Sequence, residues 1–205
     1  MIEKKNLPSD LRSILGRGAP HVPNLLTLCA VFCGLTSVRL SGEDQYGWAA
    51  AAIVGAVILD VADGFAARRL AATSAMGAEL DSLADFLNFG VAPAMLVYRR
   101  GLHLLGWTGW VVAGFYVLAT VVRLARFNIR ARIEGGEAHK WFVGLPSTGA
   151  AVAILLCDGA ANFMLTPSSA ATVVAIAAIG TGALMVSKLR VPPLAVLLGR
   201  NGRSQ

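Results

Sequence analysis

Four aspartates lie within 26 residues of an otherwise apolar sequence and form two closely spaced pairs. Asp60 and Asp63 are three residues apart, and Asp81 and Asp85 are four residues apart. Residues at these spacings share one face of a helix, so two neighbouring helices could direct all four carboxylates into one pocket. Hard divalent cations bind carboxylate oxygens and also bridge phosphate groups. The spacing therefore predicts a metal-assisted site for a substrate that carries phosphate.

The energetic cost of these acids favours a metal site over a purely structural role. An aspartate at the centre of a membrane helix costs about 2.5–3.5 kcal/mol on insertion scales. Four acids gathered without partners would also repel one another. Two divalent cations, Mg²⁺ or Mn²⁺, would supply four positive charges against the four negative ones. The alternative, helix-end carboxylates in contact with headgroup water, is disfavoured by the number of acids and their matched helical phase.

Small residues and one arginine lie between the acids at Gly64, Ala67, Arg68 and Gly77. The small side chains leave room for a ligand to enter between two helices, although close helix packing alone would also use them. Arg68 could pair with a phosphate or an acid, or anchor the helix at a charged membrane surface. Together with the flanking aspartates, these residues predict a cleft that binds a nucleotide.

The composition places the site in a membrane protein. Of the 205 residues, 56% are hydrophobic and only 15% are charged, whereas soluble domains have about 25% charged residues. The chain is predicted to be an all-α integral membrane protein, because six apolar segments are long enough, or nearly so, to cross a bilayer as helices. These segments cover residues 24–41, 47–70, 78–98, 104–127, 145–165 and 169–187.

The chain is predicted to form a single domain over residues 1–205, with the six-helix bundle in residues 23–187. Residues 1–22 mix apolar and basic side chains, which is typical of an amphipathic helix lying at the membrane interface. A disordered basic tail is the alternative for this segment. Residues 188–205 are predicted to be a cytoplasmic tail. The net charge of +6 fits an anionic membrane surface better than nucleic acid, because most basic residues flank apolar segments.

The distribution of basic residues predicts the orientation in the membrane. With a cytoplasmic N-terminus, 15 of the 18 Lys and Arg residues would lie on the cytoplasmic side, and only Arg39, Arg99 and Arg100 would lie on the other. The positive-inside rule therefore predicts a multi-pass protein of the inner (cytoplasmic) membrane with both termini in the cytoplasm. The four aspartates would face the cytoplasm. Asp158 lies within the fifth segment, towards the far side, and is not assigned to the site.

The stretch that begins at Asp60 resembles the CDP-alcohol phosphotransferase family. It reads Asp63-Gly64-x2-Ala67-Arg68-x8-Gly77-x3-Asp81-x3-Asp85, and with Asp60 it matches the family motif at eight positions. The resemblance, which covers about residues 20–165, implies a dimeric six-helix membrane fold with a cytoplasmic active site. It implies that Asp85 is the general base and that Asp60, Asp63, Asp81 and Asp85 are metal ligands. The nucleotide contacts that it implies are Asp60, Gly64, Ala67, Arg68, Gly77 and Asp81.

Four further segments resemble the phosphatidylserine synthases of this family. They are PNLLTL, ELDSLADFLNFGVAPAMLVY, RLARFNI and FVGLPSTGAA, although Ser-Thr-Gly follows Pro146 where a second proline is more usual. This resemblance implies that CDP-diacylglycerol is the phosphatidyl donor, L-serine is the acceptor and CMP is released. Glycerol 3-phosphate or an inositol phosphate is the alternative acceptor. A membrane metal transporter, a more remote alternative, would have acids distributed through the membrane depth.

Three arginines and one asparagine near the end of the fourth segment are candidate acceptor contacts. Arg123, Arg126 and Arg130 follow one another at helical spacings of three and four residues. An arginine fork fits the carboxylate of serine, but it fits a phosphate equally well. The same arginines could simply anchor the helix at the cytoplasmic surface. Asn128 could hydrogen-bond the acceptor or cap the end of the helix.

Overall fold

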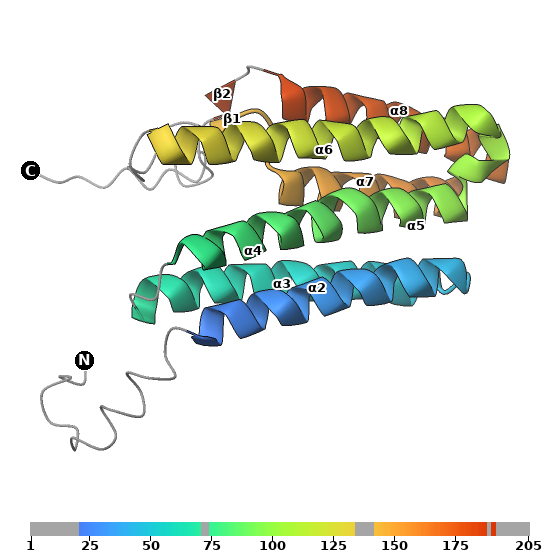
Figure 1. Ribbon diagram of the computed structural model, residues 1–205. Helices are drawn as coiled ribbons and strands as arrows, with labels where there is room; N and C mark the ends of the chain where they lie inside the picture. The colour runs from blue at the N-terminus through green and yellow to red at the C-terminus, as the bar shows by residue number, and fades with distance from the viewer. Residues whose placement is uncertain (1–20, 71–73, 134–141, 188–189, 192–205) are drawn as a thin grey trace, which may run out of the picture.

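A computed structural model of the chain describes residues 21–70, 74–133, 142–187 and 190–191 (Figure 1). It contains six helical spans, each long and apolar enough to cross a membrane, which confirms the predicted fold class. Five of the spans are single helices: α2 (His21–Gly42), α3 (Tyr46–Leu70), α6 (Trp107–Ile133), α7 (Ser147–Met164) and α8 (Pro167–Val186). The third span along the chain is the continuous run of α4 (Ala75–Asp85), η2 (Phe86–Val91) and α5 (Ala92–Arg100). Residues 1–20 of the predicted interfacial helix lie outside the described residues.

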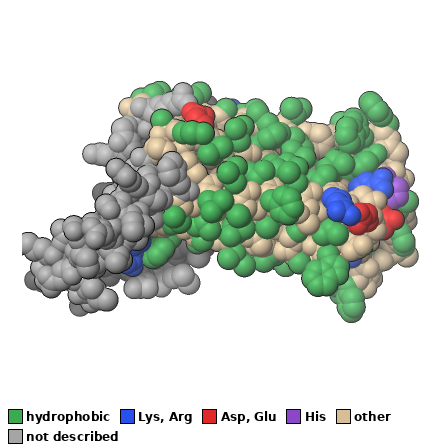
Figure 2. All heavy atoms as spheres, turned by 60° about the horizontal axis from the view of Figure 1, so that its bottom comes forward, with side chains coloured by type: hydrophobic (Ala, Val, Ile, Leu, Met, Phe, Trp, Pro, Cys, Tyr) green, Lys and Arg blue, Asp and Glu red, His purple; other side chains and the backbone are tan. Residues whose placement is uncertain are grey.

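The spans run alongside one another, so that alternate helix ends meet at the same end of the bundle (Figure 1). One end contains the start of α2, the end of α3, the start of α4 and the ends of α6 and α8. Figure 2 shows that hydrophobic side chains cover the middle of one face of the molecule. Such a surface is suited to lipid, because apolar side chains lose nothing by facing acyl chains.

The span formed by α4, η2 and α5 lies at the centre of the bundle. Half of the Ala75–Arg100 span is buried inside the protein, a larger share than for any of the other five spans. It packs against α2, α3, α6 and α7. Phe89 and Leu96 from this span are fully buried and belong to the core together with Tyr116 and Ile154. The central span therefore sets the positions of Asp81 and Asp85, which lie in its first turns.

A short strand pair connects the beginning of α7 to the segment after α8. Strand β1 (Phe142–Val143) pairs antiparallel with β2 (Arg190–Val191). Gly144 follows with a φ of +82°, and a Cβ there would lie 2.7 Å from the carbonyl oxygen of Met185. Glycine is needed because other residues rarely adopt this conformation and would clash with the backbone. The sequence did not predict this strand pair.

An ion pair with a partly buried arginine accounts for Asp158, at the end of the bundle away from the start of α4. Arg100 Nη1 lies 3.1 Å from Asp158 Oδ2, and Asn162 Nδ2 donates to Asp158 Oδ1 at 3.0 Å. Asp158 is only 2% exposed, so an arginine and an amide are the partners that a buried carboxylate requires. The pair joins α5 to α7. Arg100 is one of the three basic residues that the predicted orientation places on the side away from the cytoplasm.

Candidate active site

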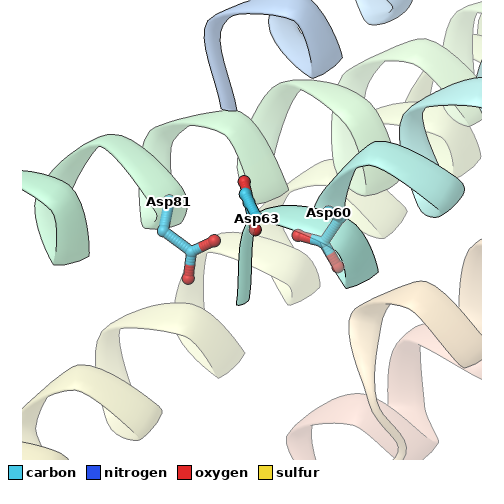
Figure 3. Close-up of side chains that lie close together, drawn as sticks. All are labelled: Asp60, Asp63 and Asp81. Carbon is cyan, nitrogen blue, oxygen red and sulfur yellow. The ribbon is translucent and has the colours of Figure 1, made fainter. Parts of the chain in front are cut away.

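The carboxylates of Asp60, Asp63 and Asp81 lie together at the junction of two helices (Figure 3). One oxygen from each carboxylate lies within 4.8 Å of the others. Asp60 and Asp63 project from the second half of α3, and Asp81 projects from α4. Ser74 starts α4 by accepting a hydrogen bond from the backbone N–H of Gly77 at 3.0 Å, as helix N-caps do. The structure thus brings together three of the four predicted metal ligands.

Asp85 lies beside this cluster, one helical turn after Asp81. Its carboxyl group shares a side-chain hydrogen bond with Asp60 and interacts electrostatically with Asp81 and Arg123. Its Oδ1 atom is buried and has no hydrogen-bond partner among the described residues. A buried oxygen of this kind normally has a partner, and a bound ion or substrate is one explanation for its absence. Asp85 is therefore placed where a ligand could use its open oxygen.

Asp63 is the most buried member of the cluster and is held by a residue from a third helix. It is 4% exposed, and Thr27 of α2 is 5% exposed. The Thr27 hydroxyl lies 2.6 Å from Asp63 Oδ2 and 3.0 Å from the carbonyl oxygen of Pro23. A hydroxyl has one proton to donate, and the shorter distance assigns it to the carboxylate. Thr27 thereby fixes the direction of Asp63.

The cluster has no salt-bridge partner among the described residues. Their only salt bridges are Arg39–Glu43 and Arg100–Asp158, both at other positions in the bundle. Two carboxylates whose oxygens are no more than 4.8 Å apart repel by about 3 kcal/mol or more at an effective dielectric constant of about 20. An all-oxygen donor set with excess negative charge fits a hard divalent cation such as Mg²⁺ or Mn²⁺. The residues present therefore fit a metal centre.

The predicted nucleotide-contact residues line the same end of α3 and the start of α4. A Cβ on Gly77 would lie 3.1 Å from Asn24 Oδ1 of α2, so glycine permits the close approach of α2 and α4. Gly64 and Ala67 are half-buried on α3, and Arg68 is exposed. The Arg68 guanidinium lies over Gly64, where a Cβ would be 3.5 Å from Nη1. An exposed guanidinium on the helix that carries Asp60 and Asp63 can meet a phosphate.

Arg123 is a half-buried acceptor candidate on α6. An attractive electrostatic interaction links its guanidinium to the carboxylate of Asp85. Its Nε donates to the carbonyl oxygen of Leu145 at 2.7 Å, and its Nη1 donates to Ser147 Oγ at 3.0 Å. These contacts use two of its five N–H donors. Residues Leu145 and Ser147 thus fix the position of the guanidinium.

The other three predicted acceptor contacts have different surroundings. Arg126 Nη1 donates to the carbonyl oxygen of Val186 at 2.7 Å, at the end of α8. Asn128 Nδ2 donates to Ser82 Oγ at 2.9 Å and joins α6 to α4. Arg130 is exposed. Asn128 does not cap the helix, because α6 continues to Ile133.

Sequence reasoning gave no role to Thr27, Ser82 or Ser147. Each side chain is polar and lies in a segment that is mostly apolar, and this was the only available signal. Thr27 follows Pro23 by four residues in the segment PNLLTL, but a threonine in a membrane helix commonly bonds to its own backbone. Their partners lie 24 to 46 residues away in the chain. Only the packing of the helices identifies those contacts.

Comparison with known proteins identifies similar chains. Residues 20–193 match the CDP-alcohol phosphatidyltransferase family. The chain is 43% identical over 138 residues to a protein of Mycobacterium bovis, a match that covers 65% of this chain and 47% of the relative. It is 35% identical over 173 residues to a protein of Helicobacter pylori, covering 83% and 71%, and 34% identical over 172 residues to one of Bacillus subtilis, covering 84% and 90%.

All three relatives are named CDP-diacylglycerol–serine O-phosphatidyltransferase. The matched region spans about half the length of the mycobacterial relative and most of the length of the Bacillus one. In each case the name describes the relative.

Replacing Thr27 with valine should weaken metal binding without unfolding the protein. The change removes the hydroxyl that fixes Asp63 and keeps the shape of the side chain. Loss of a hydrogen bond that orients a metal ligand typically lowers affinity by about 10- to 100-fold. This affinity is measured by titrating the purified protein in detergent with Mn²⁺ and recording the electron paramagnetic resonance signal of free Mn²⁺.

Thr36→Val is the matched control for this change. Thr36 also lies in α2 and donates to the carbonyl oxygen of the residue four positions earlier, Phe32, at 2.7 Å, but it does not contact the cluster. Its valine variant should bind Mn²⁺ like the wild type. Equal affinities for the Thr27 and Thr36 variants would show that the hydrogen bond to Asp63 does not support a metal centre.

Proposed function

Because the chain belongs to the CDP-alcohol phosphatidyltransferase family, we propose that it transfers the phosphatidyl group of CDP-diacylglycerol to the hydroxyl group of L-serine. The products are phosphatidylserine and CMP. The observation that carries the proposal is the gathering of Asp60, Asp63, Asp81 and Asp85 at one end of a membrane bundle. The names of the relatives from three bacterial genera support serine as the acceptor.

The four carboxylates would hold two divalent cations, Mg²⁺ or Mn²⁺. When bound, such ions offset the negative charge of a pyrophosphate and of the departing CMP. Asp60, Asp63 and Asp81 supply oxygens that already lie within 4.8 Å of one another, and Asp85 adds its open Oδ1. Thr27 keeps Asp63 directed at its neighbours.

The donor nucleotide would occupy the space next to the aspartates on α3 and α4. Gly64, Ala67 and Gly77 present little side-chain bulk there, so a ribose or a phosphate can approach the helix backbones. The exposed Arg68 would pair with a phosphate oxygen, and the carboxylates of Asp60 and Asp81 would lie close to the nucleotide. The diacylglycerol chains would remain in the lipid beside the bundle.

Asp85 would act as the general base. Its carboxylate takes the proton of the serine hydroxyl, and the serine oxygen forms a bond to the phosphorus that carries diacylglycerol. The bond between that phosphorus and the oxygen of CMP breaks in the same displacement, so no covalent enzyme intermediate is needed. A positioned general base contributes about 10²- to 10⁴-fold to such a step.

Arg123 would bind the carboxylate of serine. Its guanidinium interacts electrostatically with Asp85 and is held in place by Leu145 and Ser147. A carboxylate bound there would place the serine hydroxyl near the base, since only two carbons separate the two groups in serine. Arg126, Asn128 and Arg130 lie further along α6, where Arg126 and Asn128 instead connect α6 to α8 and α4.

The distribution of basic residues supports a location in the inner membrane with both termini and the active site on the cytoplasmic side. CDP-diacylglycerol would then enter from the cytoplasmic leaflet, and serine and CMP would exchange with the cytoplasm. The resemblance to the family supports a homodimer.

The function is tested by CMP release from purified protein in detergent with CDP-diacylglycerol and Mn²⁺. Addition of L-serine should start CMP release and label a new lipid with the serine carbon. Asp85→Asn should lower this rate by about 10²-fold or more, because the general base is removed.

The acceptor comparison separates the alternatives. CMP release that depends on glycerol 3-phosphate or an inositol phosphate, but not on serine, would contradict the proposed acceptor and retain the family chemistry. Near-normal turnover by a folded Asp85→Asn protein would contradict the role of Asp85 as the base.

Arg123→Lys should raise the KM for serine about tenfold or more, which corresponds to about 1.4 kcal/mol of binding free energy. Lysine keeps the charge but cannot form the planar fork that fits a carboxylate. The KM for CDP-diacylglycerol should change little. Steady-state CMP release at varied serine concentrations measures the effect.

Arg99→Lys serves as the control, because Arg99 also donates to a backbone carbonyl, that of Gly42 at 3.2 Å, at the other end of the bundle. An unchanged KM for serine in Arg123→Lys would show that another group binds the acceptor.

A further inference from the structure

The helix that carries Asp81 and Asp85 changes its hydrogen bonding directly after Asp85. Residues Phe86–Val91 form the π-helical turn η2, and the backbone N–H of Ala92 donates to the carbonyl oxygen of Leu87, five residues earlier. Pro93 follows and has no N–H. In a regular α-helix the N–H of the residue at position 93 would donate to the carbonyl oxygen of Phe89. Pro93 therefore leaves the Phe89 carbonyl without its α-helical donor.

Tyr116 of α6 supplies the missing donor. Its hydroxyl donates to the carbonyl oxygen of Phe89 at 3.0 Å, and both residues are fully buried. A buried carbonyl without a donor is costly, and no water is available within the apolar bundle to replace one. The Tyr116 hydroxyl thus supplies the donor that Pro93 cannot provide and ties the π-helical turn to α6.

The same face of α6 contacts the central span at three successive levels. Tyr116, Thr120 and Arg123 lie at spacings of four and three residues, which place them on one face of the helix. Tyr116 bonds to Phe89, and Thr120 packs on Gly90, where a Cβ would lie 3.1 Å from Thr120 Cγ2. Arg123 interacts electrostatically with Asp85. This face therefore runs from the π-helical turn to the active site.

We propose that Tyr116 is a positioning residue that sets the rotation of α4 and so directs Asp81 and Asp85 towards Asp60 and Asp63. One residue of an α-helix corresponds to a rotation of about 100°, and a π-helical turn holds one residue more than an α-helical turn. Conversion of η2 to an α-helical turn would therefore rotate α4 against the buried α5. The inference rests on the metal centre in the proposed function.

The test compares Tyr116→Phe with Tyr46→Phe. The Tyr46 hydroxyl also contacts a backbone carbonyl, that of Arg99 at 3.1 Å, and it contacts Asp44 Oδ1 at 2.6 Å, but it lies at the opposite end of the bundle. Tyr116→Phe should lower the affinity for Mn²⁺ per folded molecule by about 10- to 100-fold, as expected when a group that orients metal ligands is lost. Tyr46→Phe should leave this affinity unchanged. Titration with Mn²⁺ measures the affinity of the metal centre. Thermal melting of both variants measures stability separately.

The double variant Tyr116→Phe/Pro93→Ala separates position from stability. The alanine that replaces Pro93 restores an N–H that can donate to the Phe89 carbonyl in an α-helical turn. The melting temperature should recover while the affinity for Mn²⁺ stays low, because the turn is then α-helical and α4 is rotated. Recovery of both would overturn the inference, and so would equal affinities for Tyr116→Phe and Tyr46→Phe. If the wild type binds no Mn²⁺, the proposed metal centre fails and the inference fails with it.

Discussion

The gathering of four aspartates at one end of a membrane bundle is the main energetic constraint on this fold. Asp60, Asp63 and Asp81 place oxygens within 4.8 Å of one another, and Asp85 lies beside them. No salt bridge offsets these charges within the described part of the chain. Folding must bring the acids together against their repulsion, which a bound divalent cation would offset. The same excess of negative charge would attract divalent cations and, through them, a pyrophosphate.

The helices around the cluster each hold one part of the site in position. Thr27 of α2 fixes Asp63, and Leu145 and Ser147 fix the guanidinium of Arg123 on α6. The central span carries Asp81 and Asp85. A hydrogen bond from Asn128 to Ser82 connects α6 to this span. At the far end, the Arg100–Asp158 pair joins α5 to α7. The active site is therefore assembled from several helices, although two helices carry all of its aspartates.

The sequence predicted the parts of this arrangement that depend on local periodicity. Apolar length predicted six spans, and the spacing of Asp60, Asp63, Asp81 and Asp85 predicted their convergence. The contacts of Thr27 and Arg123 were not predictable, because they depend on which helix faces overlap. The π-helical turn was also missed, since a proline within an apolar segment equally predicts a kink or a helix end. Asn128 was given two possible roles, and the continuation of α6 to Ile133 excludes the helix cap.

The most direct test of this account is the number of Mn²⁺ ions that the purified wild-type protein binds, compared with that of an Asp63→Asn variant of equal thermal stability. The account predicts two ions per chain in the wild type. It predicts the loss of at least one ion when the buried carboxylate of Asp63 becomes an amide. Absence of Mn²⁺ binding to the wild type, or the same number of ions in both proteins, would contradict the assignment of the aspartate cluster as the metal centre.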